Sequence, residues 1–413
     1  MLHHRTPSVA PSARRGALFR RRSRATPVSV VLVEHRLAED GAARSNIRLA
    51  DRWTAAGVDV RLVALQRPRR GTTGAPLPPG VRPFHPSGGR HPRLRWALAW
   101  GLVRLVPLAR RADVVLSGRE IGWGLLVGRA AAAIARRPFV VMVRSEPQAA
   151  LEQYVSRRLR GVTRRALRTA DRLVCITPGL VEPTVALGVD PGRVVVVRNG
   201  VDVAGILASA TSSPPVEVPG SGPLVVGAGR LVHQKGFDVL VRAHADVVAA
   251  GVPHRLVLLG EGADRGQLEQ LAADLGVSAS VTMPGFVPNP VATVAAADLY
   301  CLPSRWEGFA QTVAEALVVG TPVIAADCVS GPRLLLGDGA RGALVPVDDA
   351  TALAREIQRH LSDPQPLRDK AVPAQSWAAE NLDVSRTAQG VLDVLTDVVA
   401  GRAGMSARRR RPR

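Results

Sequence analysis

The feature that most limits the fold of this chain is an alternation of short apolar runs with helical stretches, which stops once and then restarts. VSVVLVEH (28–35) is long enough for a buried strand, RSNIRLADRWTAAG (44–57) has helical periodicity, and VDVRLVAL (58–65) is apolar again. The alternation restarts at PLVVGAG (223–229) and continues through GALVP (342–346). Strands that alternate with helices form a parallel sheet covered on both faces, so each half is predicted to be α/β.

A Pro-, Ser- and Gly-rich segment, ASATSSPPVEVPGSG (208–222), separates the two halves and is typical of a linker. A chain of 413 residues is also too long for one compact core. We therefore predict two doubly wound, Rossmann-like α/β domains facing a cleft, because ligands of such sheets bind beyond the carboxyl ends of the strands. The N-terminal domain is placed at residues 27–202, the linker at 203–222 and the C-terminal domain at 223–400, whose last helix could pack back on the N-terminal domain.

Positive charge is concentrated at the two ends of the chain. Residues 1–26 contain seven arginines and residues 401–413 contain six, with no acidic residue in either segment, so the ends hold 13 of the 21 net charges. Segments of this composition cannot bury themselves, and we predict disordered basic tails. They could contact anionic lipid or nucleic acid, although a solvated tail is the simpler interpretation.

Two internal segments suggest contact with a membrane surface. LRWALAWGLVRLVPLARR (94–111) places Trp96 and Trp100 on one helical face, which suits an interfacial helix or a half-buried surface helix equally. SRRLRGVTRRALRTAD (156–171) carries six arginines. We expect docking on an anionic bilayer, since each basic residue near such a surface adds about 1 kcal/mol. The alternative is an arginine-biased composition, because the chain has only two lysines.

Signals of export and of membrane insertion are not found in the sequence. No apolar stretch follows the charged N-terminus before Pro27, and no run of about 18 apolar residues predicts a spanning helix. The three cysteines fit neither a zinc pattern nor a disulfide framework, and we expect them to be reduced and buried: Cys175, Cys301 and Cys328. We therefore expect a cytoplasmic protein that could lie peripherally at the inner face of the plasma membrane.

The stretch VVGAGRLVHQKGFDVL (225–240) contains a candidate phosphate site. A strand is expected to end at Gly227 and a helix to begin near Gly236, with Arg230 and Lys235 in the turn between them. A helix N-terminus attracts phosphate, Arg can bind it bidentately and Lys adds a point charge. The stretch is neither a P-loop nor a complete dinucleotide fingerprint. An ordinary turn with two solvated bases is the alternative.

The stretch SRWEGFAQTVAEA (304–316) contains two glutamates in a second turn of this kind. Glu307 is placed in the turn after a strand, and Glu315 about two turns into the following helix. Gly308 allows close backbone approach. Carboxylates oppose phosphate but accept strong hydrogen bonds from sugar hydroxyls, so the two turns together predict a nucleotide-sugar site.

Several motifs in order carry a resemblance to a known family. GRLVHQKGFDVLVRA, LGEGADRGQLEQLA, PGFV, PSRWEGFAQTVAEAL and GTPVIAADCVSGPR resemble the C-terminal half of a family-4-type retaining glycosyltransferase of the GT-B fold. RTADRLVCITPGL and VVVVRNGVD resemble its N-terminal half, so the match spans about residues 28–400. The VRSEP loop is nearer to members that act on lipid-linked glycans.

The resemblance implies roles for the residues in both turns. Arg230 and Lys235 would hold the donor diphosphate, beside Gly229. Glu307 would contact the transferred sugar and stabilise a cationic form of it. Glu315 would bind the ribose hydroxyls.

The remaining implied contacts are with the donor sugar, the base and the diphosphate. Backbone N–H groups near Gly308 and Phe309 would contact the sugar, whereas Phe286 and Val287 of PGFV would flank the base. In the N-terminal domain the implied substrate-binding residues are Gly41 and Arg144.

The sequence departs from the family pattern in three places. AEDGAARS retains one glycine, Gly41, of a usual glycine pair, which leaves backbone approach to the diphosphate less certain. VRSEP has Arg144 where many members have a sugar-contacting His. Leu334 follows GPR where a Glu is frequent, so one donor-sugar contact is missing.

The resemblance implies retaining transfer of a hexosyl or N-acetylhexosaminyl group from a nucleotide-diphosphate sugar to a hydroxyl of a glycan or glycolipid. Cationic groups can stabilise the departing diphosphate, and no Asp-x-Asp lies in a suitable turn, so we expect no metal and no cofactor. A nucleotide-sugar-binding sensor without activity and a nucleotide-sugar 2-epimerase remain alternatives. Nucleic-acid binding is the least favoured, because aromatic residues make up only 3%.

Overall fold

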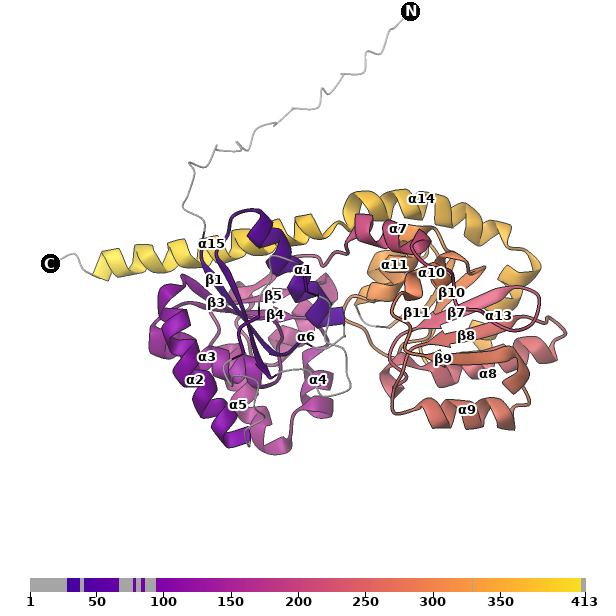
Figure 1. Cartoon of the computed structure of the whole chain (residues 1–413), viewed down its shortest axis with the longest axis horizontal. Coiled ribbons are helices and arrows are strands. Elements are labelled where there is room, and N and C mark those ends of the chain that lie inside the picture. The colour runs from indigo at the N-terminus through magenta and orange to yellow at the C-terminus, as the bar shows by residue number, and fades with distance from the viewer. Residues whose placement is uncertain are drawn as a thin grey trace, which may run out of the picture.

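The structure, a computed structural model, describes residues 28–37, 41–66, 77–78, 83–85, 94–328 and 330–409, without the side chains of 94–100 and 403–409. It contains two six-stranded parallel sheets, one in each half of the chain, with helices on both faces (Figure 1). The prediction of two doubly wound domains is therefore confirmed. The predicted tail at residues 1–26 lies outside the described residues.

The N-terminal sheet has the strand order β2-β1-β3-β4-β5-β6, and every pair is parallel. Its strands are β1 (Val30–Arg36), β2 (Val60–Gln66), β3 (Val114–Ser117), β4 (Phe139–Val143), β5 (Arg172–Cys175) and β6 (Val194–Val196). The α-helices of this half are α1 (Gly41–Ala55), α2 (Leu94–Arg111), α3 (Trp123–Ala135), α4 (Pro147–Tyr154), α5 (Arg157–Arg168) and α6 (Val181–Ala186). Short 3₁₀ helices are η1 (Pro178–Leu180) and η2 (Pro191–Arg193).

The C-terminal sheet has the strand order β12-β11-β10-β7-β8-β9, again parallel throughout. Its strands are β7 (Leu224–Ala228), β8 (Arg255–Leu259), β9 (Val281–Gly285), β10 (Leu299–Leu302), β11 (Val323–Ala326) and β12 (Ala343–Val345). The α-helices after β6 are α7 (Val203–Thr211), α8 (Phe237–Ala249), α9 (Arg265–Asp274), α10 (Pro290–Ala295), α11 (Gln311–Val319), α12 (Gly331–Leu336), α13 (Ala350–Ser362), α14 (Gln365–Asn381) and α15 (Val384–Arg409). The 3₁₀ helices are η3 (His233–Lys235) and η4 (Ser278–Ser280).

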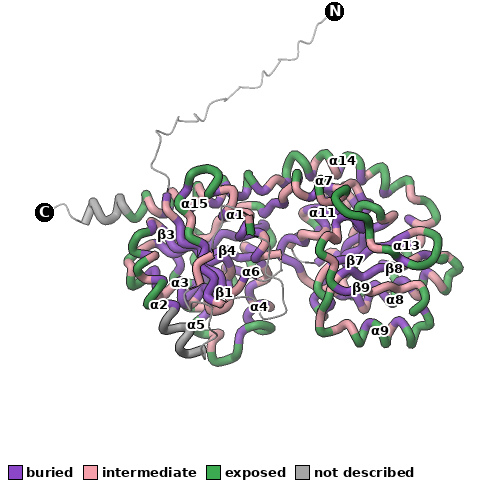
Figure 2. Tube along the Cα trace, in the orientation of Figure 1, coloured by how far each residue is buried: buried purple, intermediate pink, exposed green. Residues whose placement is uncertain are grey.

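The strands are continuous apolar runs because both faces of each sheet are covered by helices. β4 and β7 are buried at every position, and the tube view shows buried strands between helices with exposed outer faces (Figure 2). Trp53, Phe139 and Tyr300 are among the largest side chains that are fully buried. All three cysteines are free and buried, as predicted.

The chain crosses between the two domains twice, and the two crossings lie side by side. Val201 N–H donates to the Leu382 carbonyl (2.7 Å), and Val384 N–H donates to the Val201 carbonyl (2.9 Å). After the second crossing, α15 runs back over the N-terminal domain and packs against α1 (Figure 1). The indole Nε1 of Trp53 donates to the Ala388 carbonyl (2.8 Å), which ties the two helices together.

Two expected boundaries differ from the structure. The first part of the segment expected as a linker is the helix α7, whose Val203 and Ile206 are buried and which packs against α10 and α11. Asp202 caps this helix, accepting from the Gly205 N–H (3.3 Å). At the C-terminus, α15 continues to Arg409, so residues 401–409 are helical rather than a disordered tail.

Both segments expected at a membrane surface are helices, α2 and α5. The side chains of Trp96 and Trp100 lie outside the described residues. Within the part of the chain that the structure describes, no helix combines the length and the apolar character needed to cross a bilayer.

A pair of buried histidines sits on one side of the C-terminal sheet. His254 Nδ1 lies 3.1 Å from the Val252 carbonyl oxygen and must carry the proton, because a carbonyl only accepts. His254 Nε2 therefore accepts from His244 Nδ1 (2.8 Å), and His244 Nε2 accepts from the Ser280 hydroxyl (2.8 Å). Burial and the neighbouring His254 lower the pKa of His244 to about 3, so both rings are neutral.

Candidate functional site

Each sheet has one place where successive connections leave in opposite directions, and ligands of doubly wound sheets bind at such switch points. In the C-terminal sheet this place lies between β7 and β10, and in the N-terminal sheet between β1 and β3. The loops that follow β7 and β10 hold the residues of the two predicted turns. The structure therefore brings Arg230, Lys235 and Glu307 to one switch point.

The two loops at this switch point are tied together by side chains that the sequence analysis did not identify. Gln234 Nε2 donates to the Trp306 carbonyl (3.0 Å), and Arg305 N–H donates to the Gln234 carbonyl (2.9 Å). The Arg305 guanidinium binds both carboxylate oxygens of Asp238, at the start of α8 (2.9 and 2.8 Å). These bonds fix the position of Lys235 relative to the loop after β10.

A glycine is required where the first loop meets the second. Gly236 has a φ of 63°, in the left-handed region that favours glycine. A Cβ atom at this position would lie 2.2 Å from the Pro303 carbonyl oxygen, so no other residue fits without displacing the backbone. The close approach holds Lys235, the preceding residue, against the end of β10.

Lys235 and Glu307 form an ion pair inside the candidate site. Lys235 Nζ lies 2.5 Å from Glu307 Oε1, and the side chains are only 14% and 8% exposed. The Ser304 hydroxyl donates to the same carboxylate oxygen (2.8 Å). The ammonium group is thus held between the loops by a partner that is itself fixed, as a preorganised cationic site requires.

Arg230 lies at the exposed rim of the same site. Its Nη2 donates to Gln234 Oε1 (3.2 Å). The amide oxygen of Gln234 thus binds Arg230, while its amide nitrogen binds the Trp306 carbonyl in the neighbouring loop. Gly229, with a φ of 153°, precedes it. A Cβ atom at Gly260 would lie only 1.9 Å from the Gly229 carbonyl oxygen, so the ends of β7 and β8 approach closely.

Glu315 lies where α11 faces the N-terminal domain. It is 8% exposed, and its Oε1 accepts from Gln311 Nε2 (3.0 Å). A Cβ atom at Gly41, the first residue of α1, would lie 3.0 Å from Gln311 Oε1, so the two helices meet across the domain boundary. Burial lowers the pKa of Arg48, further along α1, and the Glu315 carboxylate acts against that shift.

Gly308 and Phe309 form the turn between Glu307 and α11, and they meet the N-terminal domain through their backbone. A Cβ atom at Gly308 would lie 1.7 Å from the Arg144 carbonyl oxygen. Phe309 is 5% exposed, and Ala310 has a left-handed φ of 61° at the start of α11. The close approach predicted for Gly308 is therefore an approach between the two domains.

The Arg144 side chain makes hydrogen bonds within the N-terminal domain, and its contact with substrate stays a prediction. It is 7% exposed, its Nε donates to the Gly118 carbonyl (2.9 Å) and its Nη1 donates to the Ser45 hydroxyl (3.0 Å). Its Nη2 also bonds Asn46 Oδ1. The guanidinium ties α1 to the loop after β3, and Arg144 reaches the domain boundary through its carbonyl group.

Phe286 and Val287 follow β9, the edge strand next to β8 in the C-terminal sheet. Phe286 is 53% exposed and Val287 is partly buried. A β-bulge near Val257 and Leu259 in the β8–β9 pairing precedes this point. The aromatic ring is thus accessible from solvent. In the sheet, β7 and β8 lie between β9 and β10.

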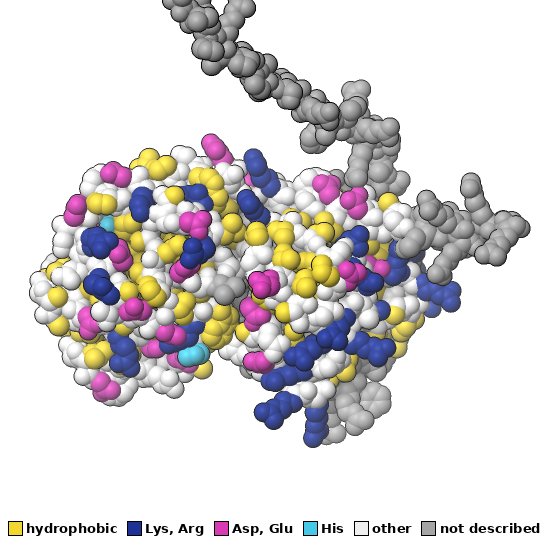
Figure 3. All heavy atoms as spheres, turned by 180° about the vertical axis from the view of Figure 1, so that it is seen from behind, with side chains coloured by type: hydrophobic (Ala, Val, Ile, Leu, Met, Phe, Trp, Pro, Cys, Tyr) yellow, Lys and Arg dark blue, Asp and Glu magenta, His cyan; other side chains and the backbone are white. Residues whose placement is uncertain are grey.

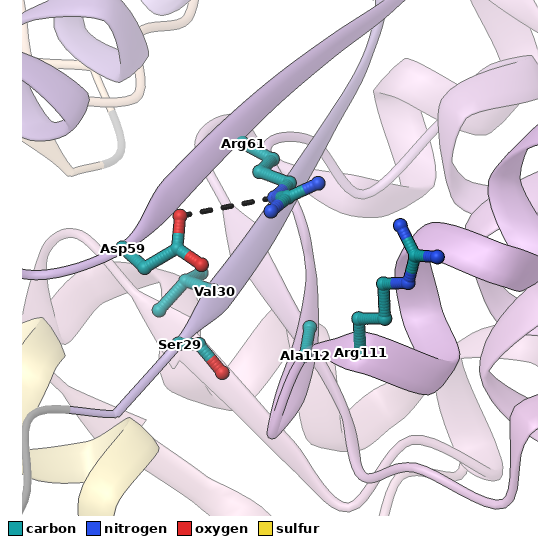
Figure 4. A pocket seen from close by; sticks show the side chains of 6 residues that line it. All are labelled: Ser29, Val30, Asp59, Arg61, Arg111 and Ala112. Carbon is teal, nitrogen blue, oxygen red and sulfur yellow. Dashed lines mark ion pairs between the residues drawn. The ribbon is translucent and has the colours of Figure 1, made fainter.

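A small pocket lies at the amino ends of the N-terminal strands, away from the switch point at their carboxyl ends. It is lined by residues at the amino ends of β1, β2 and β3, among them Ser29, Asp59 and Arg61 (Figure 4). Asp59 and Arg61 form an exposed ion pair at 3.7 Å. None of the predicted site residues lines this pocket. Among the described residues, no group of three or more His, Cys, Asp or Glu is arranged to hold a metal ion.

Two facing doubly wound domains define the GT-B fold class, and the Lys–Glu pair lies at the switch point of the second domain. The comparisons agree with this class. Residues 40–204 match the family described as "Glycosyltransferase Family 4", and residues 210–375 match "Glycosyl transferases group 1". Together the two matches cover most of both domains. The chain therefore belongs to the GT-B glycosyltransferases of the family-4 type.

Individual proteins are similar to this chain at moderate to low sequence identity, as three examples show. The chain is 33% identical to the lipopolysaccharide core biosynthesis glycosyltransferase LpsE of Rhizobium meliloti (strain 1021), over 48% of this chain and 55% of that protein, about half its length. It is 29% identical to a 2-deoxystreptamine glucosyltransferase of Streptomyces kanamyceticus, over 70% of this chain and 79% of that one. The fold is similar to that of Anabaena Alr3699/HepE in complex with UDP-glucose, with a TM-score of 0.71, 21% identity, and coverage of 90% of this chain and 100% of that one.

Proposed function

We propose that the protein is a retaining glycosyltransferase that moves a hexosyl or N-acetylhexosaminyl group from a nucleotide-diphosphate sugar to a hydroxyl group. The observation that carries the proposal is the Lys235–Glu307 pair at the switch point of the C-terminal sheet. A cation and a carboxylate in contact suit a donor with both charged and hydroxylated parts, because the diphosphate needs positive charge and the sugar needs acceptors.

Each part of the donor has a partner in this arrangement. Arg230 and Lys235 hold the diphosphate, with Gly229 allowing close approach, and Glu307 accepts from hydroxyls of the transferred sugar. The backbone at Gly308 and Phe309 contributes N–H donors to the sugar. Glu315 binds the ribose hydroxyls.

The remaining donor contacts are less central to the reaction. The base lies near Phe286 and Val287, of which the first offers an exposed ring for stacking. Gly41 borders the diphosphate from the N-terminal domain, since it already lies against Gln311 of the other domain.

The proposed reaction exchanges one bond at the anomeric carbon for another. The acceptor hydroxyl attacks on the face from which the diphosphate leaves, the bond from C1 to the diphosphate oxygen breaks, and the hydroxyl proton passes to that oxygen. Lys235 and Arg230 stabilise the charge that develops on the diphosphate, and Glu307 stabilises the cationic sugar. No metal is required, so transfer should persist in excess EDTA. Complete loss that manganese restores would contradict this step.

A UDP-hexose is the proposed donor, because UDP-glucose is the ligand in the HepE complex. The test is a screen of UDP- and GDP-sugars with purified protein, in which release of the nucleoside diphosphate and transfer to glycan acceptors are followed separately. Release without transfer to any acceptor would indicate hydrolysis only, and epimerised donor would identify a 2-epimerase. Nucleotide binding without either reaction would favour a sensor.

The proposed acceptor is a lipid-linked or membrane-held glycan. The name of LpsE refers to lipopolysaccharide core biosynthesis, and the surface of the N-terminal domain is basic. Arginine side chains gather on this domain in the view from behind (Figure 3). On α5, Val162 is 53% exposed and four arginines are exposed: Arg157, Arg158, Arg165 and Arg168. Basic and apolar side chains together on one face suit an anionic bilayer surface.

Liposome sedimentation at low and high salt tests this docking surface, and with it a cytoplasmic, peripheral location. Replacing three of the exposed α5 arginines, Arg157, Arg158 and Arg165, with Gln should weaken binding to anionic vesicles about 100-fold, at about 1 kcal/mol per residue. The matched control replaces three exposed arginines elsewhere, Arg242, Arg355 and Arg386, and should change binding little. If both sets of substitutions had equal effects, or if the unmodified protein did not bind vesicles, a small soluble acceptor would be the better proposal. The name of the 2-deoxystreptamine glucosyltransferase indicates an acceptor of this kind.

A further inference from the structure

Two sequence motifs without an assigned role meet at the boundary between the domains. Thr177 follows β5 in CITPG, and Ser330 begins α12 in VSGPR. The Ser330 hydroxyl donates to the Gly308 carbonyl oxygen (2.6 Å), and the Thr177 hydroxyl lies 3.3 Å from the same oxygen and bonds Ser330 Oγ. Thr177 is fully buried and Ser330 is half-buried.

The backbone around this cluster is packed so closely that only glycine fits. A Cβ atom at Gly179 would lie 3.0 Å from Ser330 Cα, on the opposite domain. A Cβ atom at Gly331 would lie 2.4 Å from the Phe309 carbonyl carbon. The Ser330 hydroxyl is therefore held at the Gly308 carbonyl within the C-terminal domain, whereas the contacts of Thr177 exist only while the domains are together.

Ser330 adopts a backbone conformation that a residue with a side chain rarely occupies. Its φ is 92° and its ψ is −96°. Such conformations persist only where surrounding contacts enforce them, and they cluster at ligand sites and switch regions. Here the enforcing contacts include the bonds of the Ser330 hydroxyl to Gly308 and to Thr177 of the other domain. Only the bond to Thr177 crosses the domain boundary, so this bond is the part of the support for the Ser330 conformation that depends on closure.

The direction of the Gly308 carbonyl fixes the direction of the next N–H group. In a trans peptide the carbonyl and the following N–H point in opposite directions. Holding the Gly308 oxygen towards Thr177 and Ser330 therefore turns the Phe309 N–H away from them. No hydrogen bond joins this N–H to another described residue. It is one of the donors that the proposed function assigns to the transferred sugar.

We propose that Thr177 and Ser330 are positioning residues that couple domain closure to the sugar-binding loop. When the N-terminal domain closes, Thr177 completes the hydroxyl cluster at the Gly308 carbonyl, and the Phe309 N–H is set for the donor sugar. When the domains separate, the cluster loses Thr177, and the Ser330 hydroxyl alone holds the Gly308 carbonyl. The proposal rests on the proposed function for the role of Phe309, but the closure contact itself does not.

The test compares Thr177→Val with Thr177→Ser, which retains the hydroxyl, and with Thr184→Val. Thr184 is a matched control, because it is also fully buried in the N-terminal domain, where its hydroxyl donates to the Leu180 carbonyl and contacts the Cys175 sulfur. Three quantities are measured with UDP-glucose and UDP as probes: kcat, the affinity for UDP, and the radius of gyration by X-ray scattering with and without UDP.

Thr177→Val is expected to lower kcat about tenfold, the equivalent of one hydrogen bond, while the affinity for UDP changes less than twofold. Scattering should show a larger radius of gyration in the presence of UDP than for the unmodified protein. Thr177→Ser should restore both values, and Thr184→Val should change neither. Ser330→Ala should resemble Thr177→Val, and Ser330→Gly should open the domains less than Ser330→Ala, since glycine removes the strain.

Normal kcat and normal compactness in Thr177→Val would overturn the proposal. So would equal losses in Thr177→Val and Thr184→Val, which would indicate a general effect of removing a buried hydroxyl. If the unmodified protein turned over no nucleotide sugar, the proposed function would fail. The scattering comparison would still decide whether Thr177 and Ser330 hold the domains together.

Discussion

Replacing Lys235 with methionine should destabilise the C-terminal domain in a way that a second substitution largely reverses. The methionine retains the length of the side chain but removes the charge 2.5 Å from Glu307 Oε1. Glu307 then remains as a carboxylate that is 8% exposed, with only the Ser304 hydroxyl as a side-chain partner in the described structure. Removing one member of a buried ion pair typically costs 3–5 kcal/mol. Because the Lys235 side chain is 14% exposed, we expect a value at the lower end, about 3 kcal/mol.

The double variant Lys235→Met/Glu307→Gln removes both charges and keeps an acceptor for Ser304. Its expected cost is about 1 kcal/mol, the value of a lost hydrogen bond. For a domain of this size 1 kcal/mol corresponds to about 2–4 °C, so Lys235→Met should lower the melting temperature by about 6–12 °C and the double variant by about 2–4 °C.

Differential scanning calorimetry of the two variants and of Glu307→Gln completes the cycle. Arg359→Met is the control, since Arg359 pairs with Glu356 at 2.8 Å but is 69% exposed, and exposed pairs contribute about 0–1 kcal/mol. The reasoning fails if the double variant melts no higher than Lys235→Met, or if Arg359→Met is as damaging. Either result would mean that burial of the Lys235–Glu307 pair does not determine its energy.

Three further predictions concern the loops, the nucleotide and pH. Gly236→Ala should destabilise the protein and weaken UDP binding, because its Cβ would lie 2.2 Å from the Pro303 carbonyl oxygen; Gly276→Ala, with a similar φ of 71° but open space around it, should show only the smaller backbone cost in calorimetry. Glu315→Gln should weaken UDP binding about tenfold with little change in kcat at saturating donor, and unchanged binding would remove the ribose assignment. The lowered pKa of His244, about 3 when folded against 6.5 when unfolded, means that the unfolded chain binds more protons in acid. Stability should therefore fall as the pH drops below 6.5, by about 2 kcal/mol at pH 5, and His244→Gln should flatten the chemical-denaturation profile across this range.

The sequence was sufficient to predict both sheets and the loops at the C-terminal switch point. Buried parallel strands are visible as continuous apolar runs such as PFVVMV, and the glycines at 229 and 236 mark the turn that carries Arg230 and Lys235. The helix at 203–211 was not predicted, because composition at 208–222 suggested a linker. Its helical state depends on two buried apolar side chains, Val203 and Ile206, and on neighbours far along the chain.

The parts of the site that the sequence could not predict are those created by contacts between distant segments. Gln234 and Arg305 are ordinary polar residues in the sequence, and only the folded chain places one opposite the other. The sequence predicts a substrate contact for Arg144, but it does not indicate that the carbonyl of Gly118 and the hydroxyl of Ser45 bind its guanidinium. Thr177 lies far in sequence from its bonding partners Gly308 and Ser330, so no local pattern could indicate the pairing.

The two side-by-side crossings between the domains limit how these domains can move. A single connecting segment would permit the two domains to rotate relative to each other about several axes. Two connecting segments that are hydrogen-bonded to each other at Val201, Leu382 and Val384 should allow the domains to bend about one axis but should resist a twist between them. Opening and closing should then follow one path, so that Thr177 returns to the same place opposite Gly308 after each opening. Cutting the backbone at one crossing should preserve both domains as folded units but add degrees of freedom, lowering the fraction of closures that are productive.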